Sequence, residues 1–354
     1  AFRADVTLCL GLPKIGLIHE PAATHTGELE LLDIGIAPPP GGDRPELIDE
    51  RTVRSWLPRR NASAHKHQTG TVLVIGGAPT YYGAPRLTAE AAARAGAGLV
   101  CVAAPASIIP VIAGQVPELV MLPLDESAAE AARQIMDWID GRGGHMDACI
   151  VGPGLGQTPH ATNLLERLLG DPNSGIVSSR ALRGKQPAFL LDADALNWIA
   201  KRGSFPAGVP SKTAVMTPHA GELGRLLAEP TDDLLADTIG SARRAARVFD
   251  QTLVFKSGYS VVATPEGAAW VSPRSAPELA TAGTGDVLAG LIGGILAQGM
   301  SPVDAAATAL FAGAHAGRMA RADLGTQAVM ATDVIDRIAP ALRRLSEPNW
   351  RGDE

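Results

Sequence analysis

The stretch ATAGTGDVLAGLIGGILAQG, residues 280–299, indicates how the rest of this chain folds. After Asp286, apolar residues recur at 287, 288, 291, 292, 295 and 296, which is the spacing of a single helical stripe. Glycines at 290, 293 and 294 would weaken this helix in isolation. They are tolerable where another backbone packs very close, so we expect a buried helix over residues 287–298.

The residues before this helix, Gly283-Thr284-Gly285-Asp286, are small. They leave the backbone N–H groups of the helix N-terminus unshielded, and such a terminus binds anions. Asp286 then has two interpretations. A helix cap is the commoner role for an aspartate at this place, whereas a base beside a bound phosphate is favoured by the flanking glycines.

The composition narrows the class of protein. The chain has 354 residues, of which 46% are hydrophobic, enough for one large core and a small appendage. A net charge of −6 with scattered basic residues indicates neither a nucleic-acid partner nor a polyanionic membrane surface. No apolar run is long enough to span a membrane, and there is no signal-peptide layout. Cys9, Cys101 and Cys149 are predicted to be reduced core residues of a cytoplasmic protein, without metal spacing.

The N-terminal residues 1–36 form a piece of their own. Strands are predicted at 6–10 and 29–34, with a turn at 11–14 between them. Two strands cannot bury a core alone, so this piece must dock on something or be the remnant of a larger domain.

A linker follows at residues 37–45, which contain four prolines and two glycines without periodicity. We place a domain boundary there and a tail at residues 346–354. After the linker, a short helix is predicted over 46–57, and a polar, solvated loop over 61–70 that contains His65 and His67.

From residue 71 onward, short β-branched runs alternate with alanine-rich helical runs. The predicted strands are 72–75, 99–102, 148–151, 188–191, 213–216 and 253–255, with an edge hairpin of 260–264 and 268–271. Helices are predicted at 85–95, 287–298, 302–321 and 332–345. Continuous apolar strands separated by helices predict an α/β fold of three layers, α/β/α, with a mostly parallel central sheet.

Open parallel sheets bind ligands beyond the carboxyl ends of their strands. The unusual residues of this chain cluster there, in the segments 76–85, 152–156, 192–197, 217–222 and 256–258. The sequence therefore predicts a ligand site at this edge of the sheet, next to the Gly-Thr-Gly-Asp stretch.

Each of these segments also has a plainer interpretation. The glycines of 152–156 suit either a simple turn or close approach to a ligand. Asp192 and Asp194 either hold a metal ion, or one of them caps the helix that follows. His219 is either structural or directed into the predicted cleft. Tyr81 and Tyr82 either pack or stack on a planar ring.

Taken together, the motifs resemble those of the ADP/ATP-dependent NAD(P)H-hydrate dehydratases, over residues 46–345. The motifs are GGAPTYYGAP (76–85), RAGAGLV (94–100), VGPGLG (151–156), LDADALN (191–197), TPHAGE (217–222) and AGTGDVLAG (282–290). The resemblance implies a ribokinase-like fold and a lyase that repairs hydrated nicotinamide cofactors. Residues 1–36 resemble the C-terminal remnant of an NAD(P)H-hydrate epimerase domain, and we expect no epimerase activity from this chain.

The resemblance also implies a mechanism. ADP or ATP, with Mg²⁺, would phosphorylate the ring hydroxyl of the S-epimer of hydrated NADH or NADPH (NADHX, NADPHX), and phosphate would then leave. Asp286 would be the base and would contact the hydrate together with Ala84, Gly154 or Gly156, and His219. The nucleotide would be bound by Lys256, Ser257, Gly258, Tyr259, Ser260, Gly283, Thr284 and Gly285, and no protein residue is assigned to the metal. Relatives suggest a homo-oligomer, a tetramer.

Small departures from the family pattern cast little doubt on this. Ala220 and Ala282 replace a proline and a glycine, which is small for small. The loop 272–279 lacks the Asn-Gly-Asn run of many relatives, which leaves its nucleotide contacts open. Two alternatives remain. A small-molecule alcohol kinase of the same fold would share the Gly-Thr-Gly-Asp stretch, and a non-catalytic nucleotide-binding scaffold would not need both Asp286 and His219.

Overall fold

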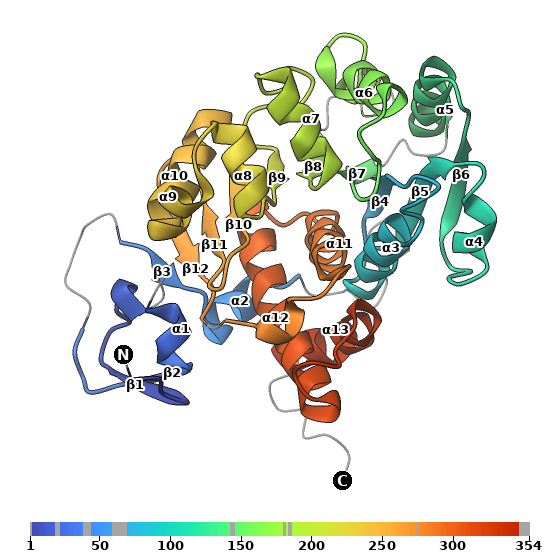
Figure 1. The fold of residues 1–354 in the computed structure, drawn as a ribbon. Coiled ribbons are helices and arrows are strands. Elements are labelled where there is room, and N and C mark those ends of the chain that lie inside the picture. The colour runs from blue at the N-terminus through green and yellow to red at the C-terminus, as the bar shows by residue number, and fades with distance from the viewer. Residues whose placement is uncertain are drawn as a thin grey trace.

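The computed structural model describes residues 2–17, 22–37, 44–58, 69–141, 146–179, 182, 186–273 and 275–346 (Figure 1). The predicted linker, the polar loop with His65 and His67, and the tail lie mostly outside these residues. The predictions for them are not tested.

A single large sheet forms the middle of the molecule. In the described residues its strands lie in the order β3-β12-β11-β10-β9-β8-β7-β4-β5-β6. Their bounds are β3 Glu46–Leu47, β4 Thr71–Ile75, β5 Leu99–Pro105, β6 Val120–Leu124, β7 Met146–Val151, β8 Ala188–Leu191, β9 Ala214–Met216, β10 Thr252–Phe255, β11 Val261–Ala263 and β12 Ala269–Val271. All neighbours are parallel except β10–β11 and β11–β12. The predicted parallel sheet and its antiparallel hairpin are confirmed, but β3 lies outside the hairpin and forms the edge.

Helices cover both faces of this sheet because every second strand residue points to the opposite side. Val72 and Val74 belong to the core under one layer, and Leu73 and Ile75 to the core under the other. The first layer holds α2 Glu50–Trp56, α3 Gly83–Arg94, α4 Ile109–Ala113, α11 Thr284–Leu296, α12 Pro302–Leu324 and α13 Ala331–Ser346. The second holds α5 Ala128–Gly141, α6 Pro159–Leu165, η2 Glu166–Gly170, η3 Ile176–Ser178, α7 Asp194–Arg202, α8 Ala220–Leu227, α9 Thr231–Ala236 and α10 Thr238–Phe249.

One helix prediction is wrong in its first residues. Glu46 and Leu47 form β3, which pairs with β12, and α2 begins only at Glu50. Asp49 fixes that start because its carboxylate accepts from the N–H of Thr52 at 2.6 Å. The strand β6 was not predicted at all, since its run VMLPL is interrupted by a proline.

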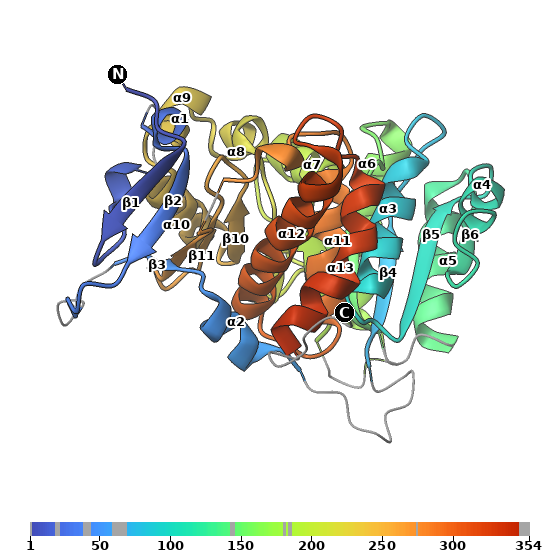
Figure 2. The same ribbon diagram turned by 90° about the horizontal axis from the view of Figure 1, so that it is seen from below.

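Helix α11 packs against α3 backbone to backbone, as its glycines predict. Figure 2 shows α3, α11, α12 and α13 side by side on one face of the sheet. A Cβ on Gly290 would overlap the carbonyl oxygen of Thr88, and one on Gly294 would lie 2.5 Å from that of Ala92. A Cβ on Gly293 would overlap Ile150 of β7. These glycines therefore set the depth at which α11 sits between α3 and the sheet.

The N-terminal piece differs from its predicted form. Its strands β1 Val6–Leu10 and β2 Glu28–Leu32 pair in parallel, with η1 Ile15–Leu17 and α1 Ala23–Thr26 between them. The predicted turn at 11–14 is therefore not a hairpin, because parallel strands need a crossover.

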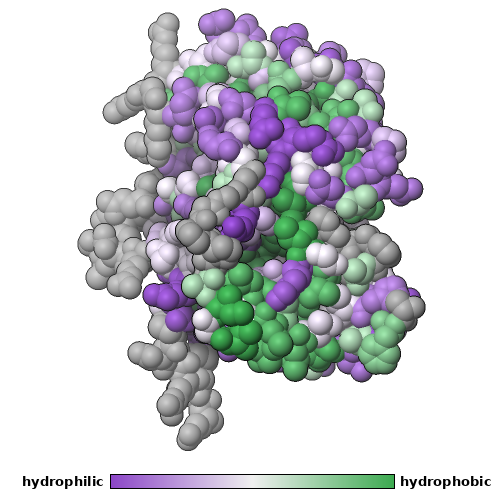
Figure 3. Space-filling view, turned by 90° about the vertical axis from the view of Figure 1, so that its left-hand side faces the viewer, coloured by the Kyte–Doolittle hydropathy of each residue, from purple (hydrophilic) through white to green (hydrophobic). Residues whose placement is uncertain are grey.

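This small sheet leaves several apolar side chains about half exposed, namely Val6, Leu8, Leu10, Leu31, Ile34 and Ile36. Figure 3 looks at the side where the piece lies and shows hydrophobic residues gathered in the lower half of the view. As expected for two strands, the piece does not bury a core alone.

Two simpler predictions can be checked directly. The three cysteines are buried, as expected. None of the helices within the described ranges is long and apolar enough to cross a lipid bilayer.

Candidate functional site

The predicted site residues meet where the parallel strands end, around the N-terminus of α11. Lys256 follows β10 and pairs in a short parallel bridge with His219, which follows β9. An ideal Cβ on Gly285 would lie 3.7 Å from Nζ of Lys256, so the lysine reaches the start of α11. Segments that are far apart in the sequence thus form one cluster.

The N-terminus of α11 is an open set of donors. Gly283 is the N-cap residue with φ of +90°, a conformation that favours glycine, and no side chain caps the helix. The hydroxyl of Thr284 donates back to the carbonyls of Leu279 and Thr281, at 2.6 and 2.8 Å. Within the described residues, the N–H groups of Gly285 and Asp286 have no acceptor. This is the arrangement that binds phosphate oxygens.

Asp286 is the third residue of α11 and is only partly exposed. Burial, together with the nearby charge of Asp192, raises its pKa to about 7, against a smaller opposing effect of Lys256. Its side chain makes no capping bond, so the cap interpretation does not hold. A carboxyl group that titrates near neutrality is suited to act as a general base.

Lys256 is held as a fixed positive charge. Its Nζ donates to Oδ1 of Asp192 at 2.9 Å, and the hydroxyl of Thr217 donates to the same oxygen at 2.6 Å. Burial alone would lower the pKa of Lys256, but the carboxylates of Asp192 and Glu222 outweigh it and raise that pKa. The lysine therefore stays protonated beside the helix N-terminus.

Asp192 is accordingly the partner of a lysine rather than an evident metal ligand. In the part of the chain that the structure describes, no three His, Cys, Asp or Glu side chains are grouped to hold a metal ion. A divalent cation at this site would have to take most of its ligands from another source, such as phosphates and water.

His219 has a structural role that its sequence context left open. It is the N-cap of α8, and its Nδ1 accepts from the N–H groups of Gly221 and Glu222, at 3.0 and 3.3 Å. Glu222 accepts in return from the N–H of His219 at 2.9 Å, which completes a capping box.

The ring is half-exposed, and its Nε2 lies 3.4 Å from Oε1 of Glu222. Burial, with the charges of Lys256 and Arg225, lowers the pKa of His219, so the ring is neutral near pH 7. Because Nδ1 accepts two bonds, the proton of the neutral ring is assigned to Nε2. The side chain is 54% exposed, so a cap and a donor to a ligand are compatible in one residue.

The glycine loop after β7 passes close to α3. Gly154 has φ of +62°, and a Cβ there would lie 2.9 Å from that of Ala84 and 2.8 Å from the carbonyl oxygen of Tyr81. The structure thus places Gly154 beside Ala84, two residues that the resemblance assigned to one ligand. Gly156 lies further from this contact, since its ideal Cβ meets only Ala78 at 3.9 Å.

The prediction that Asp192 or Asp194 caps the next helix is wrong. Ala193 is the N-cap residue of α7, and no side chain caps it. Asp194 instead accepts from the N–H of Gly156 at 2.8 Å. It holds the glycine loop of the neighbouring strand, a role that local sequence cannot reveal because its partner lies 38 residues away.

The loop after β10 closes on itself. The hydroxyl of Ser257 donates to the carbonyl of Tyr259 at 2.8 Å, and that of Ser260 donates to the carbonyl of Ser257 at 3.3 Å. Tyr259 is buried, whereas Gly258 has open space around it. The loop presents its backbone, rather than a set of long side chains, next to Lys256.

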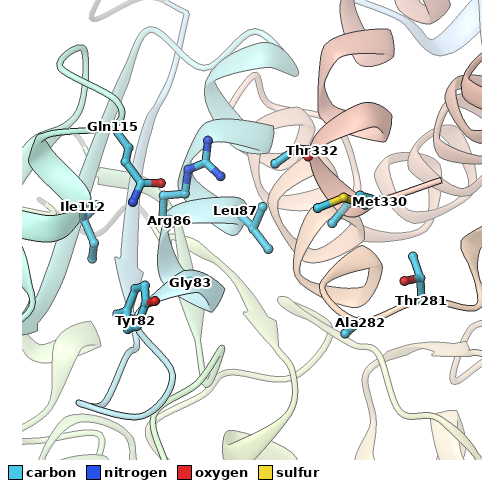
Figure 4. Close-up of a pocket in the computed structure, with 11 residues that line it drawn as sticks. Tyr82, Gly83, Arg86, Leu87, Ile112, Gln115, Thr281, Ala282, Met330 and Thr332 are labelled. Carbon is cyan, nitrogen blue, oxygen red and sulfur yellow. The ribbon is translucent and has the colours of Figure 1, made fainter. Parts of the chain in front are cut away.

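A pocket of about 510 Å³ opens on the α3 side of this cluster (Figure 4). Tyr82, Arg86 and Gln115 lie on one side of it, and Met330 and Thr332 of the α13 end on the other. Arg86 forms an ion pair of 2.8 Å with Glu90. Tyr81 and Tyr82 are 60% and 48% exposed, so they are not core residues. Stacking of either ring on a ligand stays a prediction.

A family model described as NAD(P)H-hydrate dehydratase matches residues 72–340, which is most of the chain. The chain belongs to the NAD(P)H-hydrate dehydratase family. This confirms the resemblance that the six motifs indicated.

Members of the dehydratase family occur within longer proteins. The chain is 37% identical to a bifunctional NAD(P)H-hydrate repair enzyme Nnr of Moorella thermoacetica, over 98% of this chain and 63% of that protein. It is 38% identical to the enzyme of the same name from Salinibacter ruber, over 96% and 61%. The chain thus spans less than two thirds of the length of these relatives.

Two solved structures confirm the predicted fold. An ADP/ATP-dependent NAD(P)H-hydrate dehydratase from Bacillus subtilis, co-crystallised with ATP and Mg²⁺, matches with a TM-score of 0.69 and 25% identity, over 85% of this chain and 98% of that one. A ribokinase-like protein from Enterococcus faecalis matches with a TM-score of 0.70 and 22% identity, over 88% and 100%. The three-layer ribokinase-like architecture is therefore confirmed.

Two residues of the candidate site were not singled out by sequence analysis. Thr217 shares the carboxylate of Asp192 with Lys256, and Glu222 completes the cap of His219. Both lie inside the quoted TPHAGE motif, which is the signal that could have found them. The partner of Thr217 follows another strand, so its role needed the structure, whereas the partner of Glu222 lies only three residues before it.

Proposed function

We propose that this chain dehydrates the S-epimer of NADHX and NADPHX to NADH and NADPH, with ADP or ATP as phosphoryl donor. The observation that carries the proposal is Asp286, a carboxyl with pKa of about 7 at an uncapped helix N-terminus beside Lys256. The family and the Bacillus subtilis relative support the substrate and the nucleotide.

In the proposed reaction, Asp286 accepts the proton of the ring hydroxyl while the hydroxyl oxygen attacks the terminal phosphorus of ADP or ATP. The P–O bond to the rest of the nucleotide breaks, and AMP or ADP leaves. The free N–H groups of Gly285 and Asp286 and the charge of Lys256 stabilise the phosphoryl oxygens in the transition state. The ring nitrogen then expels phosphate as the C–O bond breaks, and transfer of a proton from the neighbouring ring carbon to the departing phosphate or to water restores the dihydropyridine. Phosphorylation is needed because phosphate is a good leaving group and hydroxide is a poor one.

The remaining predicted residues have supporting places in this proposal. Ala84 and Gly154 lie side by side and would line the hydrate, as would His219 through Nε2–H. The alternative choice of Gly156 is less favoured because that residue lies away from the Gly154–Ala84 contact. Residues 256–260 and 283–285 would bind the nucleotide.

Mg²⁺ fits as a companion of the nucleotide. Asp192 already accepts from Lys256 and Thr217, and no cage of three metal-ligating side chains exists among the described residues. The nucleotide phosphates would therefore hold the cation, which when bound neutralises their charge.

We further propose a dehydratase domain over residues 46–345, preceded by a linker at 37–45 and an epimerase-like remnant at 1–36. The half-exposed apolar side chains of β1 and β2 support the view that this piece belongs to a larger unit. A cytoplasmic location is supported by three free, buried cysteines. Assembly into a homo-oligomer, a tetramer, rests on resemblance.

The function is tested by mixing the protein with enzymatically prepared NADHX, Mg²⁺ and either ADP or ATP. We expect the reduced-nicotinamide absorbance to recover with at least one nucleotide, which then identifies the donor. Absence of recovery with either nucleotide, despite nucleotide binding, would reject the dehydratase and favour an alcohol kinase of this fold.

The pH dependence of the reaction provides a separate check on Asp286. Only the deprotonated carboxylate can accept a proton, so kcat/KM should rise with pH and level off above a pKa of about 7. Below that value we expect roughly a tenfold fall per pH unit. The measurement is kcat/KM for NADHX at saturating nucleotide, between about pH 5 and about pH 9. A rate that stays level down to the pKa of an ordinary aspartate, about 4, would contradict this assignment.

A further inference from the structure

A second hollow, of about 530 Å³, lies beyond the glycine loop and His219. It is lined by Gln157, Asn197, Ala200, Lys201 and Arg225. Gln157 directly follows Gly156, and Arg225 is close enough to His219 to lower the pKa of its ring. The hollow therefore adjoins the residues proposed to line the hydrate.

The cations of this hollow are held by neutral partners. Nζ of Lys201 donates to the amide oxygen of Gln157 at 2.7 Å, and Nε of Arg225 donates to that of Asn197 at 3.0 Å. Neither forms an ion pair with a carboxylate of the described residues. Other exposed basic residues do, for example Arg133 with Asp137 and Lys212 with Glu266.

Asp194 explains how the amides are oriented. Its Oδ1 accepts from the amide nitrogens of both Gln157 and Asn197, at 3.4 and 3.3 Å. The two amide oxygens therefore face Lys201 and Arg225. The carboxylate of Asp194 is separated from both cations by the amide groups. Its other oxygen accepts from the N–H of Gly156. The network thus fixes two positive charges relative to the glycine loop without neutralising them by contact.

We propose that Lys201 and Arg225 bind the phosphate groups of the dinucleotide hydrate. The inference rests on the proposed function and names where the part of the substrate beyond the nicotinamide lies. With the ring at Asp286 and Gly154, the chain of the dinucleotide runs past Gly156 into the hollow. Two cations match the two charges of its diphosphate bridge, and a local positive pair offsets the net charge of −6 that would otherwise repel an anionic substrate.

The test uses Lys201→Gln, Arg225→Gln and the double variant, with NADHX and NADPHX as substrates. KM for the hydrate should rise about tenfold for each substitution, because each removes a charge-assisted contact. The KM for ADP or ATP should stay unchanged. Arg133→Gln combined with Lys212→Gln removes the same charge elsewhere and should leave every constant unchanged. Equal increases in KM for both substrates would show that the two cations bind the diphosphate bridge. A larger increase for NADPHX would show that they bind its extra phosphate.

Three results would overturn the inference. One is an active wild-type protein whose double variant keeps its KM for both hydrates, which leaves the proposed function intact. If the wild type shows no dehydration, the proposed function fails instead, and calorimetric binding of NADP⁺ and inorganic pyrophosphate decides about the hollow. Equal binding of these ligands by the wild type and the double variant would also reject it. So would substitutions that raise the KM for ADP or ATP instead of the KM for the hydrate.

Discussion

Asp286→Asn is expected to lower kcat for NADHX dehydration by about a thousandfold, the loss that follows removal of a general base. The amide keeps the shape of the side chain and the N–H groups of the helix N-terminus, so nucleotide binding should persist. Single-turnover kinetics with saturating nucleotide measures the first effect, and calorimetric titration with ADP and ATP measures the second.

Asp304→Asn is a matched control for this variant. Asp304 is the third residue of α12, just as Asp286 is the third residue of α11, so both carboxylates favour a helix dipole to a similar degree. The hydroxyl of Ser301 caps α12, which has no part in the proposed chemistry. Equal losses in the two variants would mean that Asp286 acts through its helix and not as the base.

Gly290→Val is expected to lower the free energy of unfolding by at least about 3 kcal/mol, since the new side chain must displace α3 or α11. The carbonyl of Thr88 and the Cβ of Ala91 occupy its space, the latter at 2.8 Å. Urea denaturation followed by circular dichroism measures the change.

Gly313→Ala provides the opposite expectation. Gly313 lies within α12, and an added Cβ would meet only Leu291, at an ordinary 3.6 Å. Alanine should there stabilise the protein by about 1 kcal/mol through helix propensity. A Gly290→Val protein as stable as wild type would show that α11 and α3 are not in backbone contact.

Sequence alone predicted the sheet and the edge at which the site lies. Short apolar runs rich in β-branched residues, such as Val72–Ile75, are typical of strands buried on both faces, and the glycines of α11 indicate close packing. The order of the strands could not be read in this way, because it depends on crossovers rather than on local pattern. The parallel pairing of β1 with β2 was missed for the same reason.

The identities of the site residues were also more predictable than their partners. Asp286, Lys256 and His219 stood out by type and position, and they do lie together. The bond from Lys256 to Asp192 joins residues 64 positions apart, and the bond from Gly156 to Asp194 spans 38. Such contacts follow from strand order. Local sequence therefore could not reveal the partner that fixes the charge of Lys256, or that Asp194 binds Gly156 and does not cap its helix.

The contact between α3 and α11 has a consequence for motion in the site. Ala84 is carried by the first turn of α3 and Asp286 by the first turn of α11, and the two helices interlock at Gly290 and Gly294. Sliding one helix along the other would drive these glycines against the ridges formed by Thr88 and Ala92. The N-termini of the two helices therefore behave as a single rigid unit. Opening and closing around a ligand therefore cannot come from sliding of these two helices, and has to come from the loops of the site.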